Sequence, residues 1–405
     1  MLNELSKIGE QPKKGITRKG LSIEERDAHR LAANYMKDAG LSVRVDEAGN
    51  TIGRWGGKDK PTLIVGSHLD TVPNGGAFDG AVGVASGIAC ASAIISSNID
   101  LPYALEVIAF TDEEGAHLSG TFGSRAMMGR LTEKETMEKI DGSLNPLAIS
   151  MEKVGLNFSL LPKAKRDPKD FIAYLELHIE QGPILERIKK PIGVVTGIPF
   201  MYRYYITIKG RADHSGTTPI SMRDDALRKS ALFIEKFYHI LSTNEGKIIG
   251  NIGNIKIDPG SFNVVPKKAI MSFELRSIDQ NYLKKIENRL LKDILFKIDP
   301  KSKMDNISQK NGALMDKRIM NIIISSCKEL GYEYHIMPSG AGHDATSFAP
   351  YIPVGMIFIP SVGGKSHSAD EFTPPEAIEV GAKTLLYTIL NLKNDSSLLK
   401  KGKIN

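Results

Sequence analysis

The chain has 405 residues, more than one hydrophobic core usually organises, so two domains are expected. With 25% charged and 41% hydrophobic residues, the composition excludes a disordered or fibrous chain. The formal charge of +6 comes from scattered lysines without arginine-rich runs, so nucleic acid is not an expected partner. The two cysteines, Cys90 and Cys327, exclude a disulfide framework and a thiolate metal cluster. A metal site would therefore be built from histidines and carboxylates.

The N-terminus turns polar at once and lacks the apolar core of an export signal, so we expect a cytoplasmic protein. The longest uncharged stretch, residues 80–99, is rich in Gly, Ala and Ser and carries Ser96-Ser97-Asn98 near its end. We interpret it as a buried, closely packed helix rather than a membrane span, and expect no membrane partner.

Helices and strands alternate along the first half of the chain. Ser22 and Glu25 have the spacing of a capping box for a helix that runs to Met36. The elements predicted next are strands at 42–46 and 62–66, a helix at 80–95, and strands at 104–110 and 171–177. This alternation of strands and helices, with nearly continuous apolar runs at 62–66 and 104–110, predicts an α/β domain with a mixed, mostly parallel sheet and helices on both faces.

The pattern changes after Pro199. Apolar and polar residues alternate from Tyr204 to Ile208, which predicts a strand with one face in water. The elements predicted after it are a helix at 221–241, strands at 251–257 and 269–276, and a helix to about residue 298. We interpret this segment as an α+β domain with two helices on a four-stranded antiparallel sheet.

The alternating pattern returns from Lys317 onward. The elements predicted there are a helix to residue 330, strands at 334–337 and 354–359, and a helix at 375–392. The sequence therefore predicts one discontinuous domain, residues 1–207 and 318–405, interrupted by an inserted domain at residues 208–317.

Histidines and carboxylates follow four of the buried strands, at the point where each strand ends. They are His68, Asp70 and Asp79 after the first, Glu113 and Glu114 after the second, His178 after the third, and His367 after the fourth. Open α/β sheets bind ligands at the carboxyl ends of their strands, so we expect these side chains to meet at one edge. A single histidine or carboxylate at the end of a strand is more often a solvated or packed residue without a functional role. Four strands that each end in such residues favour a functional site.

A set of this kind suits a hydrolase with two divalent metal ions per subunit. Three imidazoles and two carboxylates suit zinc first, with manganese or cobalt as alternatives, and one carboxylate must bridge the two ions. A further carboxylate, not a ligand, is needed to move a proton from water to the leaving nitrogen. The adjacent Glu113 and Glu114 can divide these duties, because neighbouring side chains point in different directions.

These motifs resemble those of the aminoacylase/carboxypeptidase-type superfamily of dinuclear metallohydrolases. They most resemble its amidase branch, the N-carbamoyl-L-amino-acid hydrolases, allantoate amidohydrolases and β-ureidopropionases. The strings that carry the resemblance are Gly66-Ser67-His68-Leu69-Asp70-Thr71-Val72-Pro73-Asn74-Gly75-Gly76, Glu176-Leu177-His178-Ile179-Glu180-Gln181-Gly182-Pro183 and Gly216-Thr217-Thr218-Pro219. The resemblance extends over nearly the whole chain.

The resemblance implies a role for each matching residue. The implied metal ligands are His68 and His178 for one ion, Glu114 and His367 for the other, and Asp79 as the bridge. Glu113 would be the general base, and Asp70 would support His68. These roles assign the catalytic chemistry to the discontinuous domain.

The resemblance also implies the substrate contacts. His214 would stabilise the oxyanion, Arg276 would bind a carboxylate, and Asn263 and Gln181 would each make a further polar contact with the substrate. His343, in the Gly-rich loop 339–345, is a further candidate for a substrate contact. His117, close after the two glutamates, is interpreted as a loop residue.

The implied reaction is hydrolysis of an N-carbamoyl (ureido) amino acid to the amino acid, carbon dioxide and ammonia. The alternatives are an allantoate amidohydrolase or β-ureidopropionase, then an N-acyl amino acid aminoacylase or dipeptidase, and last a non-catalytic basic binding protein. The expected partners are a small anionic ureido or amide substrate and a second copy of the chain, with the inserted domain as lid and dimerisation domain. Asp213 and Ser215 around His214, and Glu274 before Arg276, depart from the usual motifs and bear on the choice of substrate.

Overall fold

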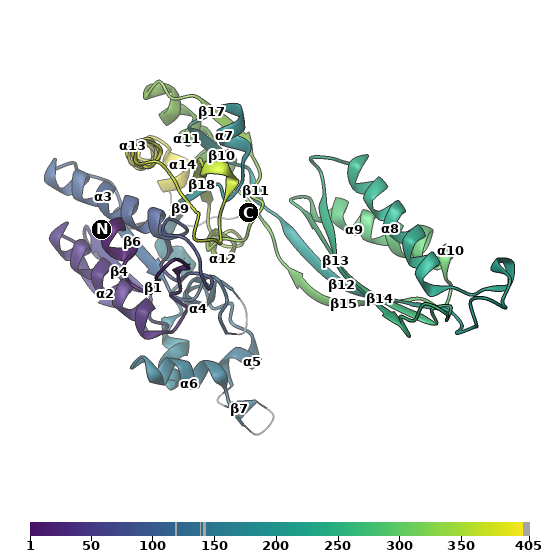
Figure 1. Cartoon of the computed structure of the whole chain (residues 1–405). Coiled ribbons are helices and arrows are strands. Elements are labelled where there is room, and N and C mark those ends of the chain that lie inside the picture. The colour runs from purple at the N-terminus through teal and green to yellow at the C-terminus, as the bar shows by residue number, and fades with distance from the viewer. Residues whose placement is uncertain (118–119, 138, 141–142, 400–405) are drawn as a thin grey trace. The chain divides into compact units, whose positions relative to one another are not determined.

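The structure is a computed structural model of the whole chain and describes residues 1–117, 120–137, 139–140 and 143–399 (Figure 1). It divides into two compact units, Met1–Gly197 with Leu314–Asn405, and Ile198–Ala313. The divisions fall slightly before the boundaries expected at residues 207 and 317. At the first of them, strand β12 (Phe200–Lys209) belongs as a whole to the sheet of the second unit.

The first unit is built on an eight-stranded sheet with the order β17-β10-β18-β9-β5-β6-β4-β3. In that order the strands span Tyr334–Met337, Ile192–Val195, Val354–Ile359, Phe171–Ile179, Thr62–His68, Ala104–Phe110, Thr51–Trp55 and Ser42–Val45. The central strands β18, β9, β5 and β6 are parallel, whereas β10, β4 and β3 add antiparallel pairings on either side. This confirms the predicted mixed sheet, and the structure places most of its parallel pairings at the centre.

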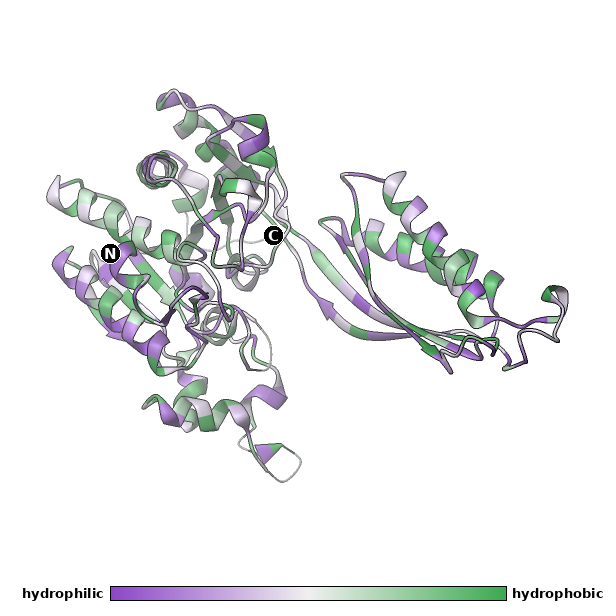
Figure 2. Cartoon of the chain, in the orientation of Figure 1, coloured by the Kyte–Doolittle hydropathy of each residue, from purple (hydrophilic) through white to green (hydrophobic). Residues whose placement is uncertain are grey.

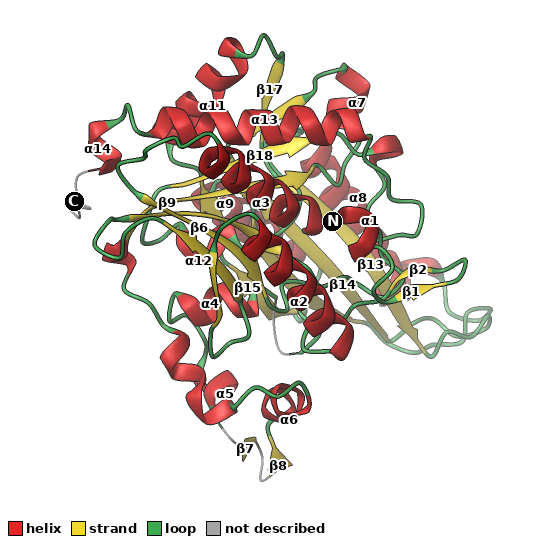
Figure 3. Cartoon of the chain, turned by 90° about the vertical axis from the view of Figure 1, so that its left-hand side faces the viewer, coloured by secondary structure: helices red, strands yellow, loops and turns green. Residues whose placement is uncertain are grey.

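Helices cover both faces of this sheet (Figure 3). One face carries α2 (Ile23–Asp38), α3 (Ala81–Ser96), α13 (Pro375–Leu392) and α11 (Lys317–Glu329), each packed against the next. The other face carries α4 (Phe122–Met127) and α12 (Ala345–Phe348). Shorter elements of this unit include α1 (Leu2–Leu5), α5 (Glu133–Thr136), α6 (Pro146–Lys153), α7 (Ile184–Ile188), α14 (Ser396–Leu399), and the antiparallel pairs of β1 with β2 (Glu10–Gln11, Gly15–Ile16) and of β7 with β8 (Lys139–Ile140, Ser143–Leu144).

Helix α3 is the predicted buried helix of small, uncharged residues. Figure 2 shows it white to green along its length, whereas α2 carries purple, hydrophilic positions as well. A side chain at Gly83 would place its Cβ 2.3 Å from the carbonyl oxygen of Leu177, so glycine lets the helix lie close to the sheet. Among the described residues, no helix is long and apolar enough to span a bilayer.

Helix α2 starts as predicted at Ser22, whose hydroxyl accepts the backbone N–H of Glu25 at 3.2 Å. The return half of the predicted capping box is wrong. The Glu25 carboxylate instead accepts the backbone N–H groups of Leu21 at 2.7 Å and of Asp112 at 2.8 Å. The carboxylate thus binds the residue before the N-cap and the loop after strand β6, and not the N–H of Ser22 itself.

Parallel register decides which side chains meet at the carboxyl edge. Strands β5 and β9 pair with Val65 opposite Leu175, and His68 and His178 follow three residues later on each strand. Val65 and Leu175 belong to the core under the helices, and successive residues of a strand point to opposite faces. His68 and His178 therefore share the other face, with ring centroids 5.8 Å apart.

The second unit is a four-stranded antiparallel sheet with the order β13-β14-β12-β15. Strands β13, β14 and β15 span Ile249–Asp258, Lys268–Ser277 and Lys303–Lys310. Helices α8 (Ala226–Ser242), α9 (Gln280–Asn288) and α10 (Phe296–Ile298) accompany the sheet, and α8 and α9 pack on it around a core that includes Phe233, Phe237 and Phe273. This confirms the predicted α+β architecture of the inserted segment.

Two details of the second unit differ from the prediction. Helix α8 begins at Ala226 rather than residue 221, because the Asp225 side chain caps it by accepting the N–H groups of Leu227 and Arg228. Strand β15 had no predicted range. Its residues are mostly polar, and it lies at the edge of the sheet, where polar side chains are common.

Candidate active site

The first unit holds the predicted metal ligands and general base. His68 and His178 lie at the carboxyl ends of β5 and β9, and Glu113 and Glu114 follow β6 directly. Asp79 precedes Gly80, the N-cap of α3, and His367 lies between β18 and α13. Gly80 has a φ of +65°, and a Cβ there would lie 2.5 Å from the His68 ring, so glycine is required where the imidazole meets the backbone.

Asp79 is the centre of the site. Its Oδ1 lies 3.1 Å from Nε2 of His178 and 3.5 Å from Nε2 of His68. Its Oδ2 lies 3.3 Å from Nε2 of His367, and that nitrogen is 3.2 Å from Oε1 of Glu114. The two oxygens of one carboxylate thus face two separate groups of side chains.

Each group has the make-up of a site for a divalent cation. The ligand atoms of His68, Asp79 and His178 lie within 4.8 Å of one another, as do those of Asp79, Glu114 and His367. Imidazole nitrogens and carboxylate oxygens are donors that suit zinc, manganese or cobalt. The residues therefore fit a pair of ions with Asp79 between them.

The charges in the site compensate one another closely. Burial alone would raise the pKa of Asp79, but its contacts with the three histidines lower it well below the usual value. Burial would likewise lower the pKa of His68, yet Asp70 and Asp79 raise it well above the usual value. Contacts with Asp79 and Glu114 raise the pKa of His367 to about 10. The carboxylates thus favour positive charge between them, which a proton or a metal ion can supply.

Glu113 is buried beside His68, with 3.9 Å between its Oε2 and Nε2 of the histidine. Burial raises the pKa of Glu113 well above its usual value; the charges of Glu114, Asp344 and Asp70 add to the rise, against the opposing effect of His68. A buried carboxyl group with a raised pKa is suited to accept and return a proton. The neighbouring Glu114 points to His367 instead.

Asp70 supports both halves of this arrangement. Its Oδ1 lies 3.3 Å from Nδ1 of His68. Its two oxygens also accept the backbone N–H groups of Glu113 and Glu114, each at 3.0 Å. The residue is fully buried, so one carboxylate orients a histidine and the loop that carries the two glutamates.

Gln181 lies next to the bridging position. Its Nε2 donates to Oδ2 of Asp79 at 2.7 Å, while its Oε1 is buried without a hydrogen-bond partner among the described residues. Gln181, His367 and Asp112 have φ values of 59°, 54° and 52°, in the left-handed region that residues other than glycine rarely adopt. Backbone strain of this kind concentrates at functional sites.

His343 is buried against the site. Its Nε2 lies 2.9 Å from the Ser339 hydroxyl, and its ring packs edge-on against His178 with centroids 4.5 Å apart. Burial, with the charge of His178, lowers the pKa of His343 well below its usual value. The substrate contact expected of His343 remains a prediction, and its contact in the structure is with a candidate metal ligand.

The remaining predicted residues lie in the second unit. His214 is exposed, accepts the backbone N–H of Gly216 at Nδ1 over 3.1 Å, and pairs in an isolated bridge with Val264, the neighbour of Asn263. Arg276 lies on β14 and donates to Oε1 of Glu274 at 2.5 Å. Phe273 and Leu275, which alternate with these two residues, belong to the core, so Arg276 lies on the sheet face away from that core.

Several buried polar residues beside the site have no counterpart in the sequence prediction. Glu176 accepts hydrogen bonds from hydroxyl groups of Ser67 and Tyr174, each at 3.0 Å. Asp344 accepts the Ser124 hydroxyl at 2.5 Å, and Glu371 accepts the backbone N–H of Asp79 at 3.0 Å. Of these, Glu176 carried a usable signal, a carboxylate inside a mostly apolar strand. His117, expected to be a loop residue, lies 3.1 Å from Oδ2 of Asp112.

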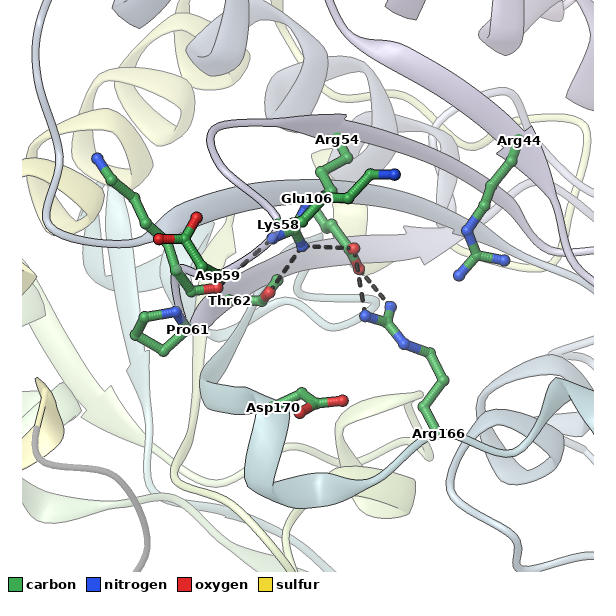
Figure 4. Close-up of a pocket in the computed structure, with 10 residues that line it drawn as sticks. Arg44, Arg54, Lys58, Asp59, Pro61, Thr62, Glu106, Arg166 and Asp170 are labelled. Carbon is green, nitrogen blue, oxygen red and sulfur yellow. Dashed lines mark hydrogen bonds and ion pairs between the residues drawn. The ribbon is translucent and has the colours of Figure 1, made fainter.

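A separate polar pocket of about 370 Å³ lies at the amino ends of β5 and β9 (Figure 4). Arg54 and Arg166 both point to Glu106 there, with N–O distances of 2.9 and 2.5 Å. Two of the basic groups of the pocket are thus paired with one buried carboxylate. Ligands of open α/β sheets bind at the opposite edge, so we interpret this pocket as a structural ion-pair network.

Comparisons with known proteins identify the family. The sequence model of peptidase family M20/M25/M40 matches residues 64–391. An N-carbamoyl-L-amino acid amidohydrolase of Geobacillus stearothermophilus is 38% identical over 401 residues, 96% of this chain and 97% of its own length. An allantoate amidohydrolase of Bacillus subtilis is 32% identical over 94% of this chain and 93% of its own.

Solved structures agree with this result. The crystal structure of an amidase of the hydantoinase/carbamoylase family from Burkholderia multivorans has a TM-score of 0.88 at 30% identity, covering 97% of this chain and 96% of that one. These similarities confirm the resemblance that the motifs around His68 and His178 carry. The chain belongs to peptidase family M20/M25/M40, in its amidase branch, and is a hydrolase of carbon–nitrogen amide bonds.

Proposed function

We propose that the protein hydrolyses an N-carbamoyl amino acid to the amino acid, carbon dioxide and ammonia. The observation that carries this proposal is the Asp79 carboxylate between two groups of potential metal ligands, with the buried Glu113 beside them. The similarity to an N-carbamoyl-L-amino acid amidohydrolase at 38% identity supports a ureido substrate.

Two divalent ions, zinc before manganese or cobalt, complete the proposed site. The residues that would hold them are His68 and His178 on one side, Glu114 and His367 on the other, and Asp79 between. Ions bound there would polarise the ureido carbonyl and lower the pKa of a water molecule.

Glu113 moves the proton in this proposal. Its carboxylate accepts a proton from the attacking water, and its protonated form returns that proton to the amino-acid nitrogen as the C–N bond breaks. The amino acid leaves with its amine, and the carbamic acid that remains decomposes to carbon dioxide and ammonia. Asp70 keeps the Glu113 backbone and the His68 ring in place through the contacts described above.

Four polar residues would recognise the substrate. His214 would donate to the oxygen that becomes negatively charged, and Arg276 would bind the α-carboxylate with its planar fork of donors, assisted by Asn263. Gln181 would use its buried Oε1 to accept a substrate N–H. The second unit would serve as lid and dimerisation domain. His214, Asn263 and Arg276 would then act on the metal site of the same chain or of a second copy.

Allantoate is the second candidate substrate. It also combines a ureido group with a carboxylate, so the same chemistry serves it, and the 32% identity to an allantoate amidohydrolase favours it specifically. β-Ureidopropionate differs only in the spacing between the two groups.

A substrate panel tests the proposal. Purified protein loaded with zinc, manganese or cobalt in turn is assayed for ammonia release from N-carbamoyl amino acids, allantoate and β-ureidopropionate, and for amine release from N-acetyl amino acids. We expect the highest kcat/KM for an N-carbamoyl amino acid. The Glu113→Gln variant serves as the inactive control. A preference for allantoate would support the second candidate, whereas a preference for N-acetyl amino acids, or no turnover with any metal, would contradict the proposal.

A further inference from the structure

Four consecutive backbone N–H groups after strand β6 are each held by a buried side-chain oxygen. Thr111 donates to Oδ1 of Asn50 at 3.0 Å, and Asp112 donates to Oε1 of Glu25 at 2.8 Å. The next two N–H groups, of Glu113 and Glu114, donate to the two oxygens of Asp70. Asn50, Glu25 and Asp70 are all fully buried. We call residues 111–114 the catalytic loop.

Of the three residues that accept these N–H groups, two come from the N-terminal segment. Glu25 lies in the first turn of α2 and Asn50 directly precedes β4, and both come before the stretch that the family model matches. The same segment touches the loop at a third point, where a Cβ on Gly20 would lie 2.0 Å from Oδ1 of Asp112. The segment therefore packs closely against Asp112, with Glu25 at its backbone N–H and Gly20 at its side chain.

The loop needs such support because its conformation is costly. Asp112 has a φ of 52°, which costs of the order of 1–3 kcal/mol for residues other than glycine and persists only where the surroundings impose it. The backbone at Asp112 sets the directions of the next two side chains, one toward His68 and one toward His367. A small backbone rotation at Asp112 would therefore displace both Glu113, the candidate base, and Glu114, the candidate metal ligand.

We propose that Glu25 is a positioning residue for the catalytic loop, holding the strained backbone that aims Glu113 and Glu114 at their partners. This inference rests on the proposed function for the roles of the two glutamates. Glu25 touches neither substrate nor metal in the proposal; it acts through the N–H group of Asp112. The Oε2 oxygen of the same carboxylate bonds Leu21, which ties the start of α2 to the loop.

Hydrogen–deuterium exchange of the metal-free protein tests the positioning role without relying on turnover. We expect amides 111–114 to exchange at least about tenfold faster in Glu25→Ala, because a buried N–H group loses its acceptor. Glu25→Gln keeps one acceptor and should restore most of the protection. Ser22→Ala is the matched control, because it removes a cap from the same helix without touching the loop.

Kinetics and metal titration of the same variants supply the second readout. Glu25→Ala should lower kcat about 10- to 100-fold with little change in KM, and weaken binding of one of the two metal equivalents. Gly20→Ala should have a smaller effect in the same direction, and it tests the loop if Glu25→Ala does not fold. Ser22→Ala should keep kcat near the wild-type value.

Loop exchange in Glu25→Ala and Gly20→Ala equal to that of Ser22→Ala would overturn the inference. Equal losses of kcat in Ser22→Ala and Glu25→Ala would do the same, because general destabilisation would then explain both. A wild-type protein that hydrolyses no ureido substrate would refute the proposed function, while the exchange experiment would still decide the role of Glu25.

Discussion

Oδ1 of Asp70 accepts the backbone N–H of Glu113 at 3.0 Å. The same oxygen lies 3.3 Å from Nδ1 of His68, so one atom contacts both a candidate metal ligand and the backbone of the candidate base. Because Asp70 is fully buried, water cannot replace either contact at low cost.

Asp70→Asn should therefore lower kcat/KM about 10- to 100-fold. The side-chain nitrogen of the asparagine would face either a backbone N–H or the histidine, and it cannot accept a hydrogen bond as the carboxylate oxygen does. The decrease should be accompanied by weaker binding of the ion next to His68, measured by competition with a chelating dye. Asp38→Asn, an exposed substitution on α2, is the control. Unchanged kinetics and metal affinity would show that Asp70 is a packing residue only.

Glu113→Gln removes the proton acceptor and leaves the ligand groups intact. We expect kcat to fall about 10²- to 10⁴-fold, the usual contribution of a general acid–base group, with two metal equivalents still bound. The measurements are steady-state kinetics and metal analysis of the dialysed protein. Glu24→Gln, exposed in the first turn of α2, is the matched control for the substitution itself. Full activity of the Glu113 variant would exclude Glu113 as the base.

Removal of metal should abolish activity and lower the melting temperature, because ions that bind only the folded state stabilise it. At free metal about 100 times Kd the stabilisation is about 2.7 kcal/mol per site. His367→Ala should retain one of the two metal equivalents, while His335→Ala, at an exposed position on β17, should retain both. Two equivalents retained by the His367 variant would contradict the assignment of this ligand.

The pH dependence of stability should reveal Asp344. Burial, with the charge of Glu176, raises its pKa to about 8. The folded state holds this proton more tightly than the unfolded chain does. Asp344 therefore stabilises the folded state most strongly below about pH 4, and this stabilisation is lost as the pH rises to about 8. Asp344→Asn resembles the protonated form at every pH and escapes this loss.

We therefore expect the melting temperature of metal-free Asp344→Asn to increase relative to wild type from about pH 5 to about pH 8, and the difference to become constant above that. Differential scanning fluorimetry in buffers containing a chelator measures it, with Asp38→Asn as the control. A difference that stays constant over the whole range would refute the raised pKa.

Local patterns were sufficient to predict the elements that carry the site. The apolar runs at 62–66 and 104–110 are buried strands, and the stretch at 80–95 is the closely packed helix α3. Since parallel strands present their carboxyl ends at one edge, His68 and His178 could be expected to meet there, and their rings do.

Patterns were insufficient where a contact joins distant parts of the chain. The spacing of Ser22 and Glu25 predicts a capping box, yet the Glu25 carboxylate bonds Asp112, 87 residues away. Asp344, in the Gly-rich loop 339–345, gave no signal of its burial beside Ser124. Strand β15 escaped prediction because an edge strand needs no apolar alternation.

The sequence by itself thus determined the alternation of helices and strands in the first unit and the residue types that end each central strand. These follow from composition and from hydrophobic periodicity, which are local properties. Only the tertiary structure decided that Asp79 directs its two oxygens to different histidines and that Glu25 and Asn50 hold the catalytic loop. Such contacts depend on register and helix packing, which exist only once the sheet has assembled and burial has made each unpaired polar group costly.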